Sequence, residues 1–273
     1  MTLSWVDGQP FDGLSVHDRG LAYGDGLFET IKVVDGRPEL LDRHLDRLKR
    51  GCRTLAIPCN SEALRRQLTA FSVELVNGVA KLIVSRGEGR RGYAQPDPVI
   101  PRTIILGSPF PNYPDAHFTQ GVKLYSCTTR LAEQPLLAGL KHLNRLEQVL
   151  ARSEWQDPAY AEGLMRDMSG LVIEGVFSNL FIIESGKLLT PALDRCGVAG
   201  VMREELLERA GLIGVDTQVT DITLERLLDA DEVFMCNSLY GVWPVRQIEA
   251  CVWSVGPLTR KLQRLVADLS SNT

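Results

Sequence analysis

The sequence has no long apolar run. No stretch of its 273 residues approaches the ~18 to 20 consecutive apolar residues that a membrane-spanning helix needs. The N-terminus, Met1 to Trp5 followed by Asp7-Gly8, has no charged segment leading into an apolar one, so it lacks the pattern of a secretory signal peptide. We therefore expect a cytoplasmic protein with no membrane partner.

The sequence also lacks paired cysteines and clustered histidines. Six cysteines that lie far apart in the sequence are typical of reduced, mostly buried thiols and not of a disulfide framework. The four histidines are dispersed, with no cysteine or carboxylate at metal-ligand spacing, so we expect no metal site. The six cysteines form no CxxC pair and lie far apart, at Cys52, Cys59, Cys127, Cys196, Cys236 and Cys251.

Basic residues are not concentrated anywhere in the chain. Lysine and arginine number 30 against 34 acidic residues, which gives a net charge of −4. No basic run could track a phosphate backbone, so we expect no nucleic-acid partner. A hydrophobic content of 44% is ordinary for a globular protein. The length allows one large domain or two modest ones, each with its own core.

Hydrophobic patterning divides the chain into two mixed regions. In the first, Asp42 could cap a helix that runs to Leu55, and Ser61 could cap another that runs to Val76. The predicted strands of this region cover 3–6, 27–34, 79–85 and 103–106. In the second region, we expect strands over 122–127, 163–183, 232–236 and 242–248, and helices over 144–155, 201–210, 224–228 and 258–269.

A proline-rich stretch separates the two regions. The segment from Gly107 to Gly121 contains Pro109, Pro111 and Pro114, and proline resists the interiors of helices and sheets. We therefore predict a mixed α/β (α+β) protein with two lobes. The smaller N-terminal lobe covers residues 1–107, a linker covers 108–121, and the larger lobe covers 122–273.

One glycine motif is misleading. Gly87 to Gly92 fits the GxGxxG pattern and follows a predicted strand. A dinucleotide site would need a helix next, with its N-terminus at the pyrophosphate. That helix is excluded by three prolines, at Pro96, Pro98 and Pro101. We therefore reject a nicotinamide site.

The same glycine-rich stretch has two remaining interpretations. It could be a flexible surface loop. It could also be an anion-binding lid, because Arg90, Arg91 and Tyr93 lie on it and arginine suits carboxylates and phosphates.

Several single residues have an unremarkable interpretation when each is taken alone. Lys141 lies between an apolar stretch and a helix start, and Glu174 follows an apolar strand. Arg47 is one of several arginines in its helix, and Gly200 to Arg203 opens another helix. A surface charge or an ordinary helix start would explain each of them. Their order along the chain is the informative feature.

In that order, six segments spread over nearly the whole chain resemble the fold-type IV pyridoxal-phosphate enzymes, a family that includes branched-chain and D-amino-acid aminotransferases and aminodeoxychorismate lyases. The segments are Asp18 to Glu29, Arg43 to Leu48, the surroundings of Lys141, Glu174 to Phe181, Gly197 to Arg203, and Cys236 to Ser238.

The resemblance implies roles in binding pyridoxal 5'-phosphate. Lys141 matches the lysine that forms the Schiff base with the cofactor, and a free lysine, with a pKa of about 10.4, needs such a link to act near neutral pH. Glu174 matches the carboxylate that keeps the pyridine nitrogen protonated. The implied phosphate contacts are Arg47, the amides of Val201 and Met202, and Asn237 or Ser238.

Within the family, Gly139 to Leu150 and Ser85 to Tyr93 look like the lyase versions of these segments. This implies an elimination that gives 4-aminobenzoate and pyruvate, in folate biosynthesis. The substrate carries two carboxylates, for which Arg91 is the first candidate, with Tyr93 beside it and Arg86 as a weaker one. Leu21 brings no hydroxyl to the opening segment, so Lys141 or water would protonate the leaving group.

Two alternatives stay open, and the family implies one partner. The first alternative is a D-amino-acid or branched-chain aminotransferase of the same fold. The second is a non-catalytic pyridoxal-phosphate-binding protein. The family also implies a homodimer that acts on a small anionic molecule.

Overall fold

The computed structural model describes residues 3–267. The chain forms two compact units. Unit 1 contains the residues up to Pro111 together with Leu140–Asn144, and unit 2 contains Asn112–Gly139 and the residues from Arg145 on. The division after Pro111 lies within the proline-rich stretch. The return of Leu140–Asn144 to unit 1 is a long-range feature that local patterning does not indicate.

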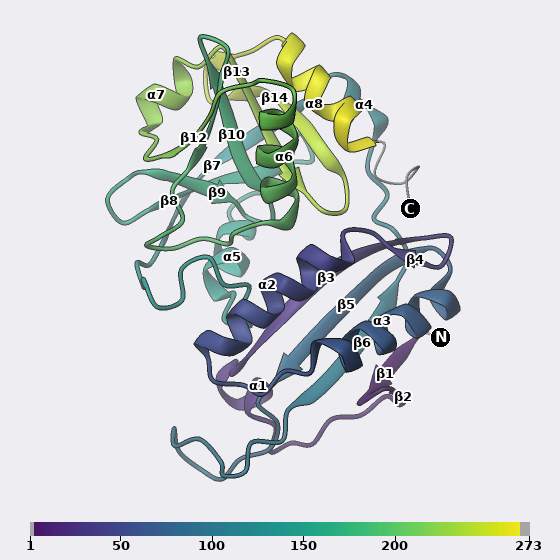
Figure 1. Ribbon diagram of the computed structural model, residues 1–273. Coiled ribbons are helices and arrows are strands. Elements are labelled where there is room, and N and C mark those ends of the chain that lie inside the picture. Colours follow the sequence, from purple (N-terminus) through teal and green to yellow (C-terminus); the bar gives the residue numbers. More distant parts are fainter. Residues whose placement is uncertain (1–2, 268–273) are drawn as a thin grey trace. The chain divides into compact units, whose positions relative to one another are not determined.

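Unit 1 is a six-stranded antiparallel sheet with the strand order β2-β1-β6-β5-β3-β4. Helices α2 and α3 cover one face of this sheet (Figure 1). Apolar side chains of the two helices and of the sheet, such as Leu48, Leu68, Phe71 and Ile31, form its core. The elements are β1 (Ser4–Val6), β2 (Gln9–Pro10), α1 (Arg19–Tyr23), β3 (Gly26–Val34), β4 (Arg37–Pro38), α2 (Leu41–Thr54), α3 (Ser61–Leu75), β5 (Gly78–Ser85) and β6 (Arg102–Ser108).

The predicted helix caps of this unit are wrong by one or two residues. Helix α2 begins after Leu40, which has a left-handed backbone (φ 51°) and makes no side-chain cap, while Asp42 lies in the first turn. Helix α3 is capped by Asn60, whose side chain accepts a hydrogen bond from the amide of Ala63, and Ser61 is its first residue. An asparagine directly before the predicted serine made the two caps nearly equivalent in sequence.

Unit 2 is built on a nine-stranded mixed sheet. Its strand order is β12-β11-β10-β13-β14-β7-β8-β9, with β15 paired to β14. Strands β14, β7 and β8 are parallel neighbours. The elements are α4 (Asp115–Thr119), β7 (Val122–Leu131), α5 (Leu146–Arg152), β8 (Tyr160–Asp167), β9 (Val172–Gly175), β10 (Asn179–Glu184), β11 (Lys187–Pro191), α6 (Val201–Leu212), β12 (Thr217–Thr220), α7 (Leu224–Leu228), β13 (Glu232–Asn237), β14 (Gly241–Ile248), β15 (Cys251–Val252) and α8 (Pro257–Ala267).

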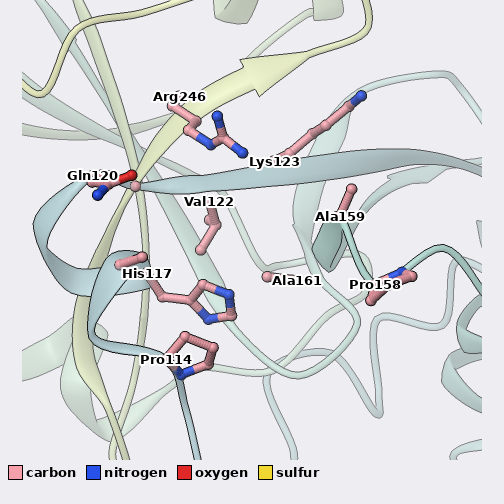
Figure 2. A pocket seen from close by; sticks show the side chains of 11 residues that line it. Pro114, His117, Gln120, Val122, Lys123, Pro158, Ala159, Ala161 and Arg246 are labelled. Atoms are coloured by element: carbon pink, nitrogen blue, oxygen red, sulfur yellow. The ribbon is translucent and has the colours of Figure 1, made fainter.

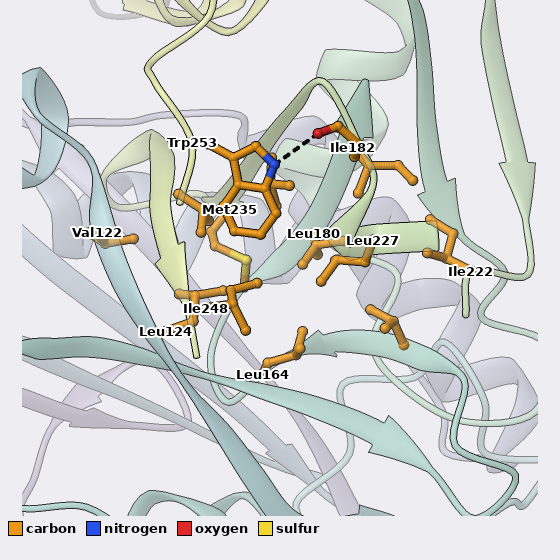
Figure 3. Packing of buried hydrophobic residues seen from close by; sticks show 14 of the residues in the cluster. Val122, Leu124, Leu164, Leu180, Ile182, Ile222, Leu227, Met235, Ile248 and Trp253 are labelled. Carbon is orange, nitrogen blue, oxygen red and sulfur yellow. Dashed lines mark hydrogen bonds between the residues drawn. The ribbon is translucent and has the colours of Figure 1, made fainter. Parts of the chain in front are cut away.

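The main core of unit 2 gathers side chains from most of its strands. Figure 3 shows Leu180, Ile182, Met235 and Ile248 packed together with Trp253 at the top of the cluster. The indole Nε1 of Trp253 donates a hydrogen bond of 2.8 Å to the carbonyl of Ala230. This bond satisfies the only polar atom of the indole side chain. No helix between residues 3 and 267 is long and apolar enough to cross a membrane.

Candidate active site

Lys141 lies in the short segment that returns to unit 1. The segment runs beside β3: the amide of Phe28 donates to the carbonyl of Lys141 (2.9 Å), and the amide of Leu143 donates to that of Gly26 (3.0 Å). The Nζ atom of Lys141 lies 4.4 Å from the centroid of the Phe28 ring. Backbone pairing with a rigid strand therefore fixes the position of this lysine, and the aromatic face interacts favourably with its charge.

A buried ionic cluster occupies the same strand of unit 1. The carboxylate of Glu29 on β3 is 1% exposed. It accepts a hydrogen bond of 2.8 Å from Nε of Arg47 and a second from the Nη2 of that residue. The Nδ1 atom of His44 lies 2.6 Å from Glu29 Oε2, the same oxygen that accepts the bond from Nη2 of Arg47. Arg47, predicted as a phosphate ligand, is thus anchored by a bidentate ion pair that sequence reasoning missed.

The protonation states of this cluster follow from charge and burial. Burial alone would raise the pKa of Glu29, but the charge and hydrogen bonds of Arg47, with that of His44, lower it to about 2. Burial lowers the pKa of His44 despite its bond to Glu29, and the charges of Arg47 and Lys141 lower it further. The cluster therefore holds an ionised carboxylate, a guanidinium and a neutral imidazole.

In unit 2, Glu174 lies on β9 and is buried, with an exposed fraction of 4%. Its Oε2 accepts a hydrogen bond of 2.9 Å from the amide of Val198. Next to it, Gly197 has a φ of 83°, and a Cβ there would come within 2.8 Å of the Ile173 and Leu193 side chains. The turn before α6 thus approaches Glu174 closely because it carries a glycine.

Helix α6 begins after a glycine that packs closely against Asn179. Its N-cap is Gly200, which supplies no side-chain cap, so the amides of the first turn, those of Val201 and Met202 among them, have no partner of that kind. A Cβ on Gly200 would come within 1.9 Å of Oδ1 of Asn179. The Nδ2 of Asn179 donates to the carbonyl of Val198 (2.8 Å). A helix start built in this way suits an anion such as a phosphate.

Asn237 and Ser238 lie at the end of β13. The Oδ1 atom of Asn237 accepts hydrogen bonds from the amides of Leu239 (2.9 Å) and Tyr240 (3.0 Å). This side chain therefore shapes the turn between β13 and β14. Of the two predicted phosphate contacts here, the Ser238 hydroxyl is the one that we retain as a proposal.

A second buried carboxylate, Glu162 on β8, was not predicted as part of the site. It is 0% exposed and accepts hydrogen bonds from the amides of Gly163 (2.8 Å) and Val176 (3.0 Å). It also accepts one of 2.5 Å from the hydroxyl of Ser178, which in turn accepts one of 2.6 Å from the hydroxyl of Tyr240. These bonds hold the turn that directly follows Glu174.

The three predicted substrate residues have different surroundings in unit 1. Arg86 is 3% exposed; its Nε and Nη2 donate to the carboxylate of Asp25 (2.8 and 3.0 Å), and its Nη atoms donate to the carbonyls of Leu55 (2.7 Å) and Ala56 (3.0 Å). These contacts fit a structural role at the end of α2. Arg91 and Tyr93, in contrast, are exposed.

The glycine-rich loop that carries Arg91 and Tyr93 is fastened to unit 1 by Arg19. The guanidinium of Arg19 donates to the carbonyls of Gly92 (3.0 Å) and Tyr93 (3.3 Å) while also binding Asp25. The rings of Tyr23 and Tyr93 lie in contact, 5.5 Å apart. This loop carries no helix, as the prolines predict.

These features define a class of protein. Residues 26–248 match the amino-transferase class IV family, and the chain belongs to this family. Among its relatives is an aminodeoxychorismate lyase of Vibrio harveyi, 42% identical over 95% of this chain and 97% of the relative. A putative branched-chain-amino-acid aminotransferase of Methanocaldococcus jannaschii is 30% identical over 94% of this chain and 91% of the relative.

Solved structures give the same result. The crystal structure of 4-amino-4-deoxychorismate lyase from Pseudomonas aeruginosa is 62% identical, with a TM-score of 0.96 over 97% of this chain and 98% of that one. The predicted family, the mixed α/β fold and pyridoxal 5'-phosphate as cofactor are thereby confirmed. Each unit by itself carries groups of the kind that this cofactor needs: unit 1 has the amine of Lys141, and unit 2 has the buried carboxylate of Glu174 and the start of α6, which has no side-chain cap.

Proposed function

We propose that this chain is a 4-amino-4-deoxychorismate lyase, which releases 4-aminobenzoate and pyruvate and supplies folate biosynthesis. The observation that carries the proposal is the similarity to the two lyases, at 42% and 62% identity over nearly the whole chain. The identity to the aminotransferase relative is lower, at 30%.

The proposed roles of the residues follow from their chemistry. When bound, the cofactor supplies an electron sink for the bond-breaking steps. Lys141 would hold the cofactor through its Nζ, and its amine would remove the proton from the ring carbon that bears the amine of the substrate. Glu174 would keep the pyridine nitrogen protonated, since an anionic oxygen there favours the charged form. Arg47, the amides of Val201 and Met202, and Ser238 hold the phosphate.

The substrate's carboxylates need cationic partners, and Arg91 is our first choice because it is exposed on an anchored loop. Arg91→Ala should raise KM for aminodeoxychorismate, while the visible absorbance of bound cofactor stays unchanged. Arg90→Ala is the matched control and should leave KM unchanged. Loss of cofactor from the Arg91 variant would instead assign Arg91 to the phosphate.

The reaction is tested by a product assay with the purified holoenzyme. One arm contains aminodeoxychorismate and measures 4-aminobenzoate and pyruvate; the other contains D-alanine and 2-oxoglutarate and measures glutamate. We expect equal amounts of the first two products and negligible glutamate. Lys141→Ala should lose both turnover and the visible absorbance of lysine-bound cofactor. Fast glutamate formation without 4-aminobenzoate would reject the lyase in favour of an aminotransferase.

We further propose that the protein is a cytoplasmic homodimer. The six cysteines are all free, as expected in a reducing compartment. Helix α5 carries three apolar side chains on one face, Leu146, Val149 and Leu150, which are 75%, 61% and 59% exposed. A contiguous apolar face of this kind on a single chain is typical of an interface.

The dimer is tested by sedimentation of a surface variant. Leu146→Glu combined with Leu150→Glu should convert the dimer to a monomer, because it places charges on the apolar face. Val73→Glu, at an apolar residue of α3 that is 64% exposed, is the matched control and should stay dimeric. A monomeric wild-type protein would refute the proposal.

A further inference from the structure

Unit 2 contains a pocket that none of the proposed cofactor or substrate residues lines. Its volume is about 180 Å³, many times the ~10–15 Å³ that one water molecule requires. It lies between α4, the start of β7, the residues that lead into β8, and β14. Figure 2 shows His117 on one side of it, with Lys123 and Arg246 on the other.

Two irregularities of the sheet shape this pocket. The pairing of β14 with β7 shifts between Val245 and Gln247, which leaves Arg246 without a partner in the register. On the other side of β7, the register passes from Tyr160 directly to Glu162, which leaves out Ala161. Arg246 and Ala161 both line the pocket. Bulges re-aim side chains and are frequent at functional sites, and here both irregularities lie next to the same residue of β7, Lys123.

The charges that line the pocket are all positive. Lys123 and Arg246 contribute two cations, and none of the described lining residues is acidic. The Nζ atom of Lys123 lies 4.6 Å from the centroid of the Tyr160 ring, a contact that orients the ammonium without neutralising it. Lys123 and Arg246 give the pocket a positive lining, which attracts an anion.

His117 adds a polar group on the opposite side of the pocket. Its Nδ1 atom is buried without a hydrogen-bond partner, which is an uncommon arrangement in a folded protein. Its ring lies edge-on to Trp243, with 4.8 Å between the centroids, so packing holds it in place. Burial, and then the charge of Arg246, lower the pKa of His117, so the ring is neutral at pH 7 and adds no positive charge to the pocket.

We propose that this pocket is a binding site for a small oxyanion, a carboxylate or a phosphate group, held by Arg246 and Lys123 beside His117. The guanidinium of Arg246 suits two oxygens at once, and Lys123 supplies a compact point charge. The volume admits an anionic group with a short organic substituent.

The test uses the holoenzyme and the ring C–H resonances of its histidines, of which there are four. His117→Gln assigns the relevant signal. Sodium phosphate and sodium acetate are titrated in separate arms at constant ionic strength, with sodium chloride as the balancing salt. We expect a saturable shift of the His117 signal with at least one of them. The arm that saturates identifies the group as a phosphate or a carboxylate.

Variants give a second criterion. Arg246→Gln and Lys123→Gln should each weaken the anion by roughly tenfold, the usual size of one charge-assisted hydrogen bond, while Lys187→Gln, at an exposed lysine of β11, should bind as the wild type does. A shift that is linear in both arms, or that survives the combined Arg246 and Lys123 substitutions, would overturn the proposal. Because the signal is local to His117, this result does not depend on the lyase reaction.

Discussion

Units 1 and 2 each contain a buried glutamate next to a segment that carries a proposed catalytic or cofactor residue. The pKa values of the two glutamates are shifted in opposite directions. Glu29 is next in sequence to Phe28, which pairs with Lys141, and its pKa lies at about 2. Glu162 supports the turn after Glu174, and its pKa lies at about 7. Both are almost completely buried, so burial alone does not explain the difference.

The difference lies in the charge of the partners. Glu29 is paired with a guanidinium, whose positive charge outweighs the cost of burial. Glu162 is surrounded by neutral donors, namely the Ser178 hydroxyl and backbone amides, which only partly offset that cost. A buried carboxylate therefore stays firmly ionised only where a cation is buried with it.

The largest expected effect comes from removing that cation. Arg47→Met would leave Glu29 buried without its partner, and breaking a buried ion pair costs about 3–5 kcal/mol of unfolding free energy. The measurement is urea unfolding at pH 7, followed by circular dichroism. Combining Arg47→Met with Glu29→Gln should recover much of the loss, because no charge then remains to be buried. If the double variant were as unstable as the single one, loss of packing and not of charge would be the cause.

The second prediction concerns the dependence of stability on pH. Glu29 has a folded pKa of about 2, below its ordinary value of 4.5, so its contribution is present above pH 4.5 and is lost as the pH falls from there toward 2. Glu162 has a folded pKa of about 7, above 4.5, so its own contribution to stability is fully present below pH 4.5 and is lost as the pH rises from 4.5 through 7. Each contribution amounts to about 3 kcal/mol at most.

The two contributions are separated by substitution. Unfolding free energies are measured between pH 3.5 and 8 for the wild type, for Glu29→Gln and for Glu162→Gln. In the curve of unfolding free energy against pH, Glu29→Gln should flatten only the acid limb, below pH 4.5. Glu162→Gln should flatten only the neutral limb, between pH 4.5 and 7. Glu74→Gln, at an exposed position of α3, should leave both limbs intact. If Glu162→Gln left the neutral limb unchanged, another group would be responsible for it.

The sequence carried a usable signal for one of these glutamates. Along β3, the buried positions alternate, so that Glu29 shares a face with Leu27, Ile31 and Val33. A carboxylate in the apolar phase of a strand indicates a buried partner, and this phase can be read without a structure. Glu162 offers no such signal, because its strand has no regular alternation.

Other parts of the fold depended on long-range contacts. Strand β3 and helices α2 and α3 follow from local periodicity, and the predicted strand over 27–34 agrees with Gly26–Val34 within one residue. The return of Leu140–Asn144 to unit 1 depends on pairing with β3, more than a hundred residues earlier. The contacts of Arg86 with Asp25 and with the end of α2 are equally non-local. Local patterns therefore predicted the longer elements but not short ones such as α4, β11 and β12, and the family resemblance predicted the candidate residues.

The smallest expected effect concerns the outermost member of the Glu162 network. Tyr240→Phe removes the hydroxyl that donates to Ser178 and keeps the ring, which stacks on Trp243 with 3.7 Å between the centroids. The loss of one neutral hydrogen bond should cost about 1 kcal/mol. Tyr113→Phe is the matched control, because Tyr113 contacts the same two rings, and its effect should be smaller.

The Tyr240 variant also tests how the network acts on Glu162. The Tyr240 hydroxyl donates to Ser178, which makes the Ser178 hydroxyl a better donor to the carboxylate. Without it, the ionised form of Glu162 loses support, so the neutral limb of the stability curve should move to higher pH in Tyr240→Phe and stay in place in Tyr113→Phe. A limb that stays in place in both variants would mean that the backbone amides of Gly163 and Val176 and the Ser178 hydroxyl set the pKa of Glu162 without help from Tyr240.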